Sequence, residues 1–370
     1  MHRRIAIACL ATGGCWVPHV AGVVEGAGGT AEGSGDAGTD AVDTSASSTD
    51  ATGTGTGTDT ASDCDLPAPD PACDAFADPL RTFELVCFAD VAAATFTTSD
   101  TAAWRRAHEF GNAYFAPRFG DALLVMTTGV LAEPDPSGQV AQAVGVAEPG
   151  VANDNPDDVD LPAPMRPTSG SNGGAGGAPF FDCDGVGDCS ESLVQPWSQG
   201  GRARDLLSWS ADVTVPAGAN RLELDVGWLS AEFPERVGAT ANDTFVLWVS
   251  SEAFTGNVAT LGGQPMTTTG LASLLAEHTG DDPMLLRTGV DGGTGTPCTV
   301  QGAMTPSCPR GAATDWLVLS AAVQPGETAT IAAALFDQGD DLLDSVVLLD
   351  HFRWGCEPCT PGTDCGLARP

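Results

Sequence analysis

Three aspartates near the end of the chain offer the ligand atoms that a hard cation needs. Asp337, Asp340 and Asp344 lie close together around Gly339. A glycine permits a sharp turn, and Ca²⁺ binds roughly six to eight oxygen atoms in irregular geometry. The pattern therefore predicts a calcium site, although the ligand spacing of an EF-hand is absent.

A second acidic segment carries Glu232 and, shortly after it, Asp243. If the intervening strands fold back on one another, both acidic segments meet at one end of the fold. We therefore expect one structural Ca²⁺ held by Asp337, Asp340 and Asp344, with Glu232 or Asp243 as additional ligands. The alternative is that these side chains are solvated or cap their own turns, because Asp and Gly are ordinary turn residues.

A further acidic run spans residues 153–160, and it could also hold a cation. Its proline-containing context favours a solvated loop instead.

Paired carboxylates could also serve a hydrolase. Glu232 and Asp243 are the candidates for a glycosidase-type acid and nucleophile. However, the His108-Glu109 pair is not followed by a histidine at HExxH spacing, and no G-x-S-x-G segment occurs. All fifteen basic residues are arginine, which excludes P-loop and Schiff-base lysines. We expect no enzymatic activity and keep a secreted polysaccharide-acting hydrolase as the alternative.

The charge of the chain limits its partners. Its 370 residues include 49 acidic and 15 basic ones, for a net charge of −34. Binding to nucleic acid or to an anionic membrane surface requires basic groups that neutralise phosphates. We therefore expect no nucleic-acid partner, and contact with a membrane only through an N-terminal lipid.

The N-terminus has the layout of an export signal. Arg3 and Arg4 precede a short apolar run, and Cys15 follows two glycines as in a bacterial lipobox. We predict a signal peptide over 1–15, with Cys15 as the lipid anchor or, alternatively, ordinary secretion. Residues 16–63 are rich in Gly, Ala, Thr, Ser and Asp, a composition typical of a disordered linker.

The cysteines support export. Ten remain beyond the leader, and an even set in an exported chain predicts disulfides. Cys183 with Cys189 and Cys298 with Cys308 each bracket a short loop, so we expect two local pairs. The other six cannot be paired from the sequence.

Alternating apolar residues predict strands in the second half of the chain. Residues 245–249 are apolar on both faces, which indicates a central strand. We expect an all-β, jelly-roll-like antiparallel β-sandwich over 64–356, with a long loop at 133–180 and a Cys/Pro-rich tail at 357–370. Residues 101–117 are predicted as a short helix. The other expected strands are 121–131, 222–228, 315–319, 328–336, 345–349 and 351–354.

Three blocks resemble the choice-of-anchor family, in its L-type domain. They are the segment Ser230–Gly238 (SAEFPERVG), the segment Asn242–Phe245 (NDTF) and the segment Phe336–Asp350. The resemblance covers roughly residues 120–356. It implies an extracellular domain attached to the cell surface, and here the attachment device would be the N-terminal lipid.

Taken together, these observations predict a non-catalytic cell-surface or outer-membrane protein that serves in adhesion or surface interaction. Its partner would be a surface glycan or a protein. Trp197 is the least core-like of the tryptophans and is therefore the candidate for an exposed aromatic platform.

Overall fold

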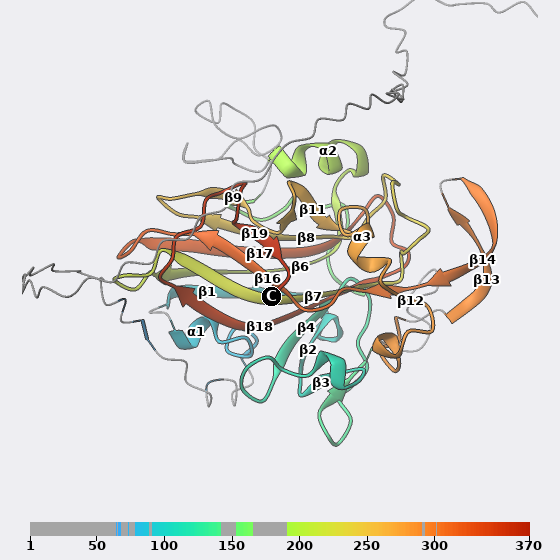
Figure 1. The fold of residues 1–370 in the computed structure, drawn as a ribbon, viewed down its shortest axis with the longest axis horizontal. Helices are drawn as coiled ribbons and strands as arrows, with labels where there is room; N and C mark the ends of the chain where they lie inside the picture. The colour runs from blue at the N-terminus through green and yellow to red at the C-terminus, as the bar shows by residue number, and fades with distance from the viewer. Residues whose placement is uncertain are drawn as a thin grey trace, which may run out of the picture. The chain divides into compact units, whose positions relative to one another are not determined.

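The computed structural model describes residues 64, 66–67, 73, 78–88, 91–141, 153–165, 191–290, 293–300 and 302–370 (Figure 1). The predicted signal peptide, Cys15, the whole of the predicted linker at 16–63 and the pair Cys183/Cys189 lie outside the described residues. Within them, the expected all-β antiparallel sandwich is confirmed: two sheets stack on each other.

The first sheet has seven strands, and its neighbouring strands are all antiparallel. Its order is β1-β6-β17-β8-β11-β10, and β9 pairs with β8. The strands are β1 (Val91–Thr97), β6 (Ala203–Thr214), β8 (Thr244–Ser250), β9 (Thr255–Asn257), β10 (Thr260–Leu261), β11 (Gln264–Thr267) and β17 (Thr328–Gln338).

The second sheet has eight strands, in the order β12-β15-β7-β18-β4-β2. Strand β16 pairs with both β7 and β19. The strands are β2 (Trp104–Ala107), β4 (Leu123–Thr127), β7 (Arg221–Ser230), β12 (His278–Thr279), β15 (Ala312–Ala313), β16 (Leu317–Ala322), β18 (Ser345–Gly355) and β19 (Gly366–Ala368).

The remaining elements are short. They comprise the hairpin of β13 (Gly293–Val300) and β14 (Ala303–Arg310), the parallel pair β3 (Glu109–Phe110) and β5 (Gln139–Val140), the helices α1 (Leu85–Phe88), α2 (Glu191–Gly200) and α3 (Ala272–Leu275), and three 3₁₀ turns at Thr101–Ala103, Ala113–Phe115 and Pro283–Leu285.

The core lies between the two sheets. Strand β7 points Leu222, Leu224, Val226 and Trp228 into it, as the alternation predicted. Strand β8 is buried on both faces, because Phe245, Leu247 and Val249 join this core while Val246 and Trp248 join a second cluster beneath α2. The central position predicted for residues 245–249 is therefore confirmed.

The helix predicted over 101–117 is wrong. Only the 3₁₀ turns at Thr101–Ala103 and Ala113–Phe115 are helical, and Trp104–Ala107 instead forms β2 against β4. Pairing with a buried neighbour overrides the weak helical preference of this short segment. The segment expected to be a tail also contributes a strand, since β19 pairs with β16.

Disulfides join parts of the chain that the sequence could not pair. Cys64 is bonded to Cys356 across a Cα–Cα distance of 5.9 Å, Cys73 to Cys87 and Cys359 to Cys365. Cys356 and Cys359 thus belong to two different disulfides, and neither is a free thiol. Cys308 is also disulfide-bonded and lies on β14, the strand paired with β13, which carries Cys298.

Candidate metal centre

Acidic residues from several strand ends converge at one end of the sandwich. Glu232 follows β7, Asp243 precedes β8 and Asp337 lies at the end of β17. The register places Phe336 opposite Thr244, so Asp337 and Asp243 lie next to each other across the β17–β8 pair. Each of Glu232, Asp243 and Asp337 has one carboxylate oxygen within 4.8 Å of the others.

These three carboxyl groups are buried. Glu232 and Asp243 have no exposed surface and Asp337 is 1% exposed. Four of their oxygens have no hydrogen-bond donor among the described residues: Oε1 of Glu232, Oδ1 of Asp243, and both oxygens of Asp337. Buried carboxylates without donors are strongly disfavoured unless a proton or a cation compensates them.

Hydroxyl groups donate hydrogen bonds to the other two oxygens of this cluster, Oε2 of Glu232 and Oδ2 of Asp243. Thr268 Oγ1 donates to Glu232 at 2.7 Å and is itself within 3.0 Å of Ser230 Oγ. Ser345 Oγ donates to Ser230 at 2.9 Å, across the β18–β7 pair. These bonds form a chain of hydroxyls that ends at Glu232.

Thr128, which directly follows β4, fixes Asp243 from the second sheet. Its hydroxyl donates to Asp243 at 3.0 Å and accepts the backbone N–H of Ser345 at 3.0 Å. Both sheets therefore orient the cluster.

Glycine permits the close approach of the acidic turn. Gly339 has a φ of +98°, and a Cβ there would lie 2.9 Å from Cα of Ala241. A larger residue would be strained in this backbone conformation and would push the 339–341 turn away from the Asn242-Asp243 segment.

Two more buried carboxyl groups adjoin the cluster. Asp344 precedes β18, is 4% exposed, and its Oδ2 has no donor among the residues that the structure describes. Asp205 is 2% exposed and has a φ of +49°, and none of the described residues donates to its Oδ1. The register between β6 and β17 shifts beside Asp205, and a bulge of this kind re-aims a side chain.

The sequence analysis missed Asp205. It lies within a strand whose alternation gives no sign of a bulge, and no turn residue marks the position.

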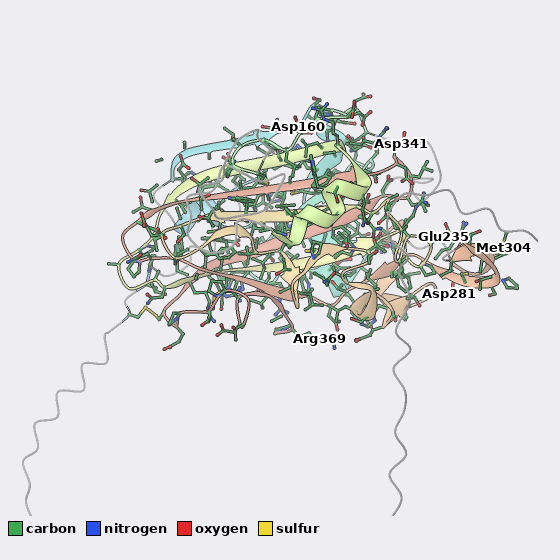
Figure 2. All side chains as sticks on the ribbon, turned by 90° about the horizontal axis from the view of Figure 1, so that it is seen from above. Asp160, Glu235, Asp281, Met304, Asp341 and Arg369 are labelled. Atoms are coloured by element: carbon green, nitrogen blue, oxygen red, sulfur yellow. A yellow bond between two sulfur atoms is a disulfide. The ribbon has the colours of Figure 1, made fainter. Side chains whose placement is uncertain are left out.

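Asp340, predicted as a ligand, lies outside the group of three. Its carboxylate forms a salt bridge with Arg236 at 2.5 Å. Its neighbour Asp341, labelled in Figure 2, is exposed. The structure therefore brings together Glu232, Asp243 and Asp337, with Asp344 beside them, and gives Asp340 a different partner.

Burial raises the pKa values of this cluster. It is the largest cause for Glu232 and Asp337, and the charge of Asp243 raises the pKa of both further. Burial also raises the pKa of Asp243, although the hydrogen bond from Thr128 opposes it.

The two adjoining groups behave in the same way. Burial raises the pKa of Asp344 to about 9 and that of Asp205 to about 7, and neighbouring carboxylates add to both shifts. Without a cation, the cluster therefore retains protons near neutral pH.

The donor set suits a hard cation. All candidate ligand atoms are carboxylate oxygens, without histidine or cysteine, which is the chemistry of Ca²⁺ or Mg²⁺ rather than Zn²⁺. Mg²⁺ usually retains several waters, whereas Ca²⁺ accepts many protein oxygens in irregular geometry. A closed cluster that already offers several buried oxygens therefore fits Ca²⁺ better.

A second group of possible ligands lies elsewhere. Glu277, His278 and Asp315 approach within the same distance of one another, but Glu277 and Asp315 are exposed. Glu277 is paired with Arg369, and His278 contacts Asp282 at 3.2 Å. This group lacks the unpaired buried oxygens that mark the first.

The acidic run at 153–160 packs against the sandwich in part. Asn153 is buried and donates to the carbonyl of Thr128 at 2.6 Å. Asp157 is exposed and accepts the backbone N–H of Asp205 at 3.2 Å. The run therefore supports the segments that carry the cluster.

Trp197 does not form an exposed platform. It lies on α2, partly buried, with its ring 6.3 Å from that of Phe336 in an edge-on arrangement.

Among the described residues, no helix has the length and apolar character needed to cross a membrane.

Comparisons with known proteins found no match to this chain. No family model, no curated protein and no solved structure matches this chain.

Proposed function

We propose that this chain is a non-catalytic, exported surface protein whose β-sandwich is closed at one end by a structural Ca²⁺ and serves in adhesion or surface interaction. One observation carries the proposal: Glu232, Asp243 and Asp337 converge in the interior, and four of their oxygens have no donor in the described part of the chain. A divalent cation would compensate both their charge and their lost hydration.

The disulfides support export, because such bonds persist in oxidising compartments. Three are complete within the described residues. The lipobox-like position of Cys15 and the resemblance to the choice-of-anchor family support attachment to the cell surface through an N-terminal lipid.

The burial of Glu232 and Asp243 also bears on the hydrolase alternative. A glycosidase must present its acid and its nucleophile to a sugar chain. Neither of these carboxyl groups has any exposed surface. Their burial favours a structural role over a catalytic one.

The test compares metal content and thermal stability. The full chain, purified in Ca²⁺, should contain calcium by elemental analysis, and its melting temperature should fall when a chelator removes the ion. Absence of both effects would contradict the calcium site. Hydrolysis of a polysaccharide panel that is lost in Glu232→Gln would support the hydrolase instead.

A further inference from the structure

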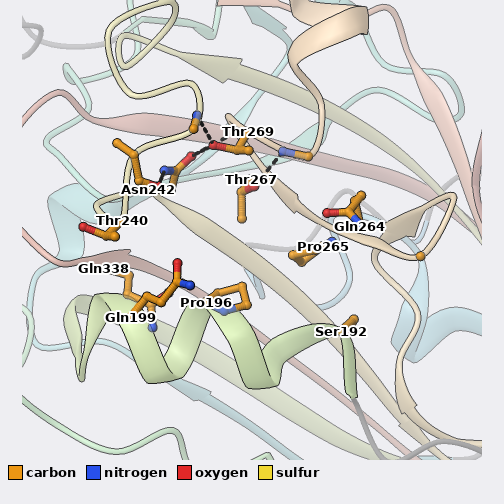
Figure 3. A pocket seen from close by; sticks show the side chains of 14 residues that line it. Ser192, Pro196, Gln199, Thr240, Asn242, Gln264, Pro265, Thr267, Thr269 and Gln338 are labelled. Carbon is orange, nitrogen blue, oxygen red and sulfur yellow. Dashed lines mark hydrogen bonds between the residues drawn. The ribbon is translucent and has the colours of Figure 1, made fainter. Parts of the chain in front are cut away.

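A pocket lies beside the acidic cluster. Its volume is about 310 Å³, close to the lower end of the range in which proteins bind small ligands. Figure 3 shows Pro196 and Gln199 of α2 across from side chains of β11 and of the loop before β8. We propose that this pocket binds a neutral saccharide.

The first argument is the charge of the lining. None of the described residues that line it is acidic or basic, although the chain carries 49 acidic residues. Amide and hydroxyl side chains dominate instead. A charged ligand would have no counter-charge in the lining, so the pocket favours a neutral and polar one.

The second argument is the hydrogen-bonding capacity that remains free. Gln199 and Gln264 are exposed, and the structure shows no hydrogen bond to either side chain among the described residues. Gln338 donates to the carbonyl of Gly201 at 2.9 Å, and its amide oxygen accepts no bond from the described residues. A side-chain amide can donate and accept at once, which matches adjacent sugar hydroxyls.

The third argument concerns rigidity. Asn242 Nδ2 donates to the carbonyls of Ala239 and Ala241 at 2.9 and 2.6 Å, while its Oδ1 accepts from Thr269 Oγ1 at 2.8 Å. These bonds fix one wall of the pocket, and Figure 3 draws the one between Asn242 and Thr269. A fixed wall lowers the entropy lost when a ligand binds.

A peptide strand fits this pocket less well. A peptide that extends a sheet needs an unpaired edge. Strand β11 is paired with β8 on one side and with β10 on the other. The lining also offers the apolar rings of Pro196 and Pro265, against which the C–H face of a sugar ring can pack.

The pocket and the acidic cluster share segments. Asn242 precedes Asp243, Gln338 follows Asp337, and Thr267 and Thr269 flank Thr268. Insofar as the inference rests on the proposed function, we expect Ca²⁺ to hold these walls in place and saccharide binding to weaken when a chelator is added.

The test uses the full chain on a glycan array of neutral and acidic glycans, in Ca²⁺. Binding of neutral glycans is the expected result. The bound glycan is then titrated against the double variant Gln199→Ala/Gln264→Ala, which should bind roughly tenfold more weakly, and against Gln324→Ala, an exposed control outside the pocket, which should bind normally. Binding of acidic glycans alone, of no glycan, or unchanged affinity in the double variant would overturn the proposal.

The melting temperature separates the two proposals. The double variant should keep the full chelator-induced shift, because its side chains do not contact the cluster. Glycan binding without any calcium effect would uphold the pocket and contradict the calcium site. A calcium effect without neutral glycan binding would uphold the calcium site and contradict the saccharide pocket.

Discussion

The backbone N–H of Asp243 donates to Oε2 of Glu232 at 3.0 Å, while Oε1 of Glu232 and Oδ1 of Asp243 have no donor among the described residues. One oxygen of each carboxyl group is thus fixed by the protein and the other has no partner in the described part of the chain. This division distinguishes the pair from acids that only cap a turn, because a capping carboxylate uses its oxygens on its own backbone.

Asp337 and Asp340 should respond differently to neutralisation. Asp337→Asn removes a buried oxygen from the cluster, whereas Asp340→Asn removes only a partner of Arg236. A ligand at a hundred times its Kd stabilises the folded state by about 2.7 kcal/mol. We expect Asp337→Asn to lose most of this calcium-dependent stabilisation and Asp340→Asn to keep it, as measured by urea denaturation with and without Ca²⁺. Equal losses in both variants would contradict the assignment.

Calcium binding should release protons. Burial raises the pKa of Asp344 to about 9 and that of Asp205 to about 7, so the metal-free cluster is partly protonated near pH 7. Bound Ca²⁺ requires ionised ligands. Titration calorimetry in buffers of different ionisation enthalpy should therefore show proton release at pH 7 and weaker binding at pH 5. A binding enthalpy that is independent of the buffer would exclude this linkage.

Metal-free stability should fall as pH rises. A carboxyl group with a raised pKa in the folded state keeps its proton after the unfolded chain has lost one, so ionisation costs the folded state. The resulting loss of stability is absent below the ordinary pKa of 3.8. It grows with rising pH up to about pH 7 for Asp205 and about pH 9 for Asp344. In chelator, the urea midpoint should decline from pH 5 to pH 9. Saturating Ca²⁺ should remove most of that decline.

Gly339→Ala should weaken calcium binding. A Cβ at this position would lie 2.9 Å from Cα of Ala241, and the φ of +98° disfavours any L side chain. The control is Gly326→Ala, where φ is +81° but a Cβ would meet no atom within 4 Å. We expect both to cost about 1–2 kcal/mol for the backbone conformation. Only Gly339→Ala should also lower calcium affinity, as measured by calorimetry.

The two disulfides near the C-terminus should differ in their contribution. Cys64 and Cys356 are 292 residues apart, whereas Cys359 and Cys365 are 6 apart. Loop-closure entropy predicts a loss of about 6 kcal/mol for Cys64→Ser/Cys356→Ser and about 2 kcal/mol for Cys359→Ser/Cys365→Ser. Denaturation of the two double variants, side by side, checks the order. A larger loss from the shorter loop would contradict the entropic account.

The sequence was most informative where a strand alternates or is apolar throughout. The period-2 pattern of β7 and the continuous apolar run of β8 identified both strands and their burial. The helix predicted from the sequence over 101–117 was wrong, because the pairing of β2 with β4 depends on a neighbouring strand that no local pattern reveals.

The sequence predicted some members of the acidic cluster and not others. Glu232, Asp243, Asp337 and Asp344 were predicted because the two acidic segments that carry them were expected to meet at one end of the fold. Asp340 lies at the same kind of position, but the charge of Arg236 engages it, and the sequence does not show which acid meets an arginine. A bulge in the pairing of β6 with β17 directs Asp205 toward the cluster, and only the register of these two strands shows it.

The bond between Cys64 and Cys356 also determines how the domain bears load. Cys356 directly follows β18, which lies between β7 and β4 inside the second sheet. A pull on the chain ahead of Cys64 reaches this interior strand through a covalent bond. The pull therefore cannot peel the N-terminal part of the domain away one contact at a time. If the chain is held by its N-terminal end, as proposed, tension passes directly into the interior of the second sheet.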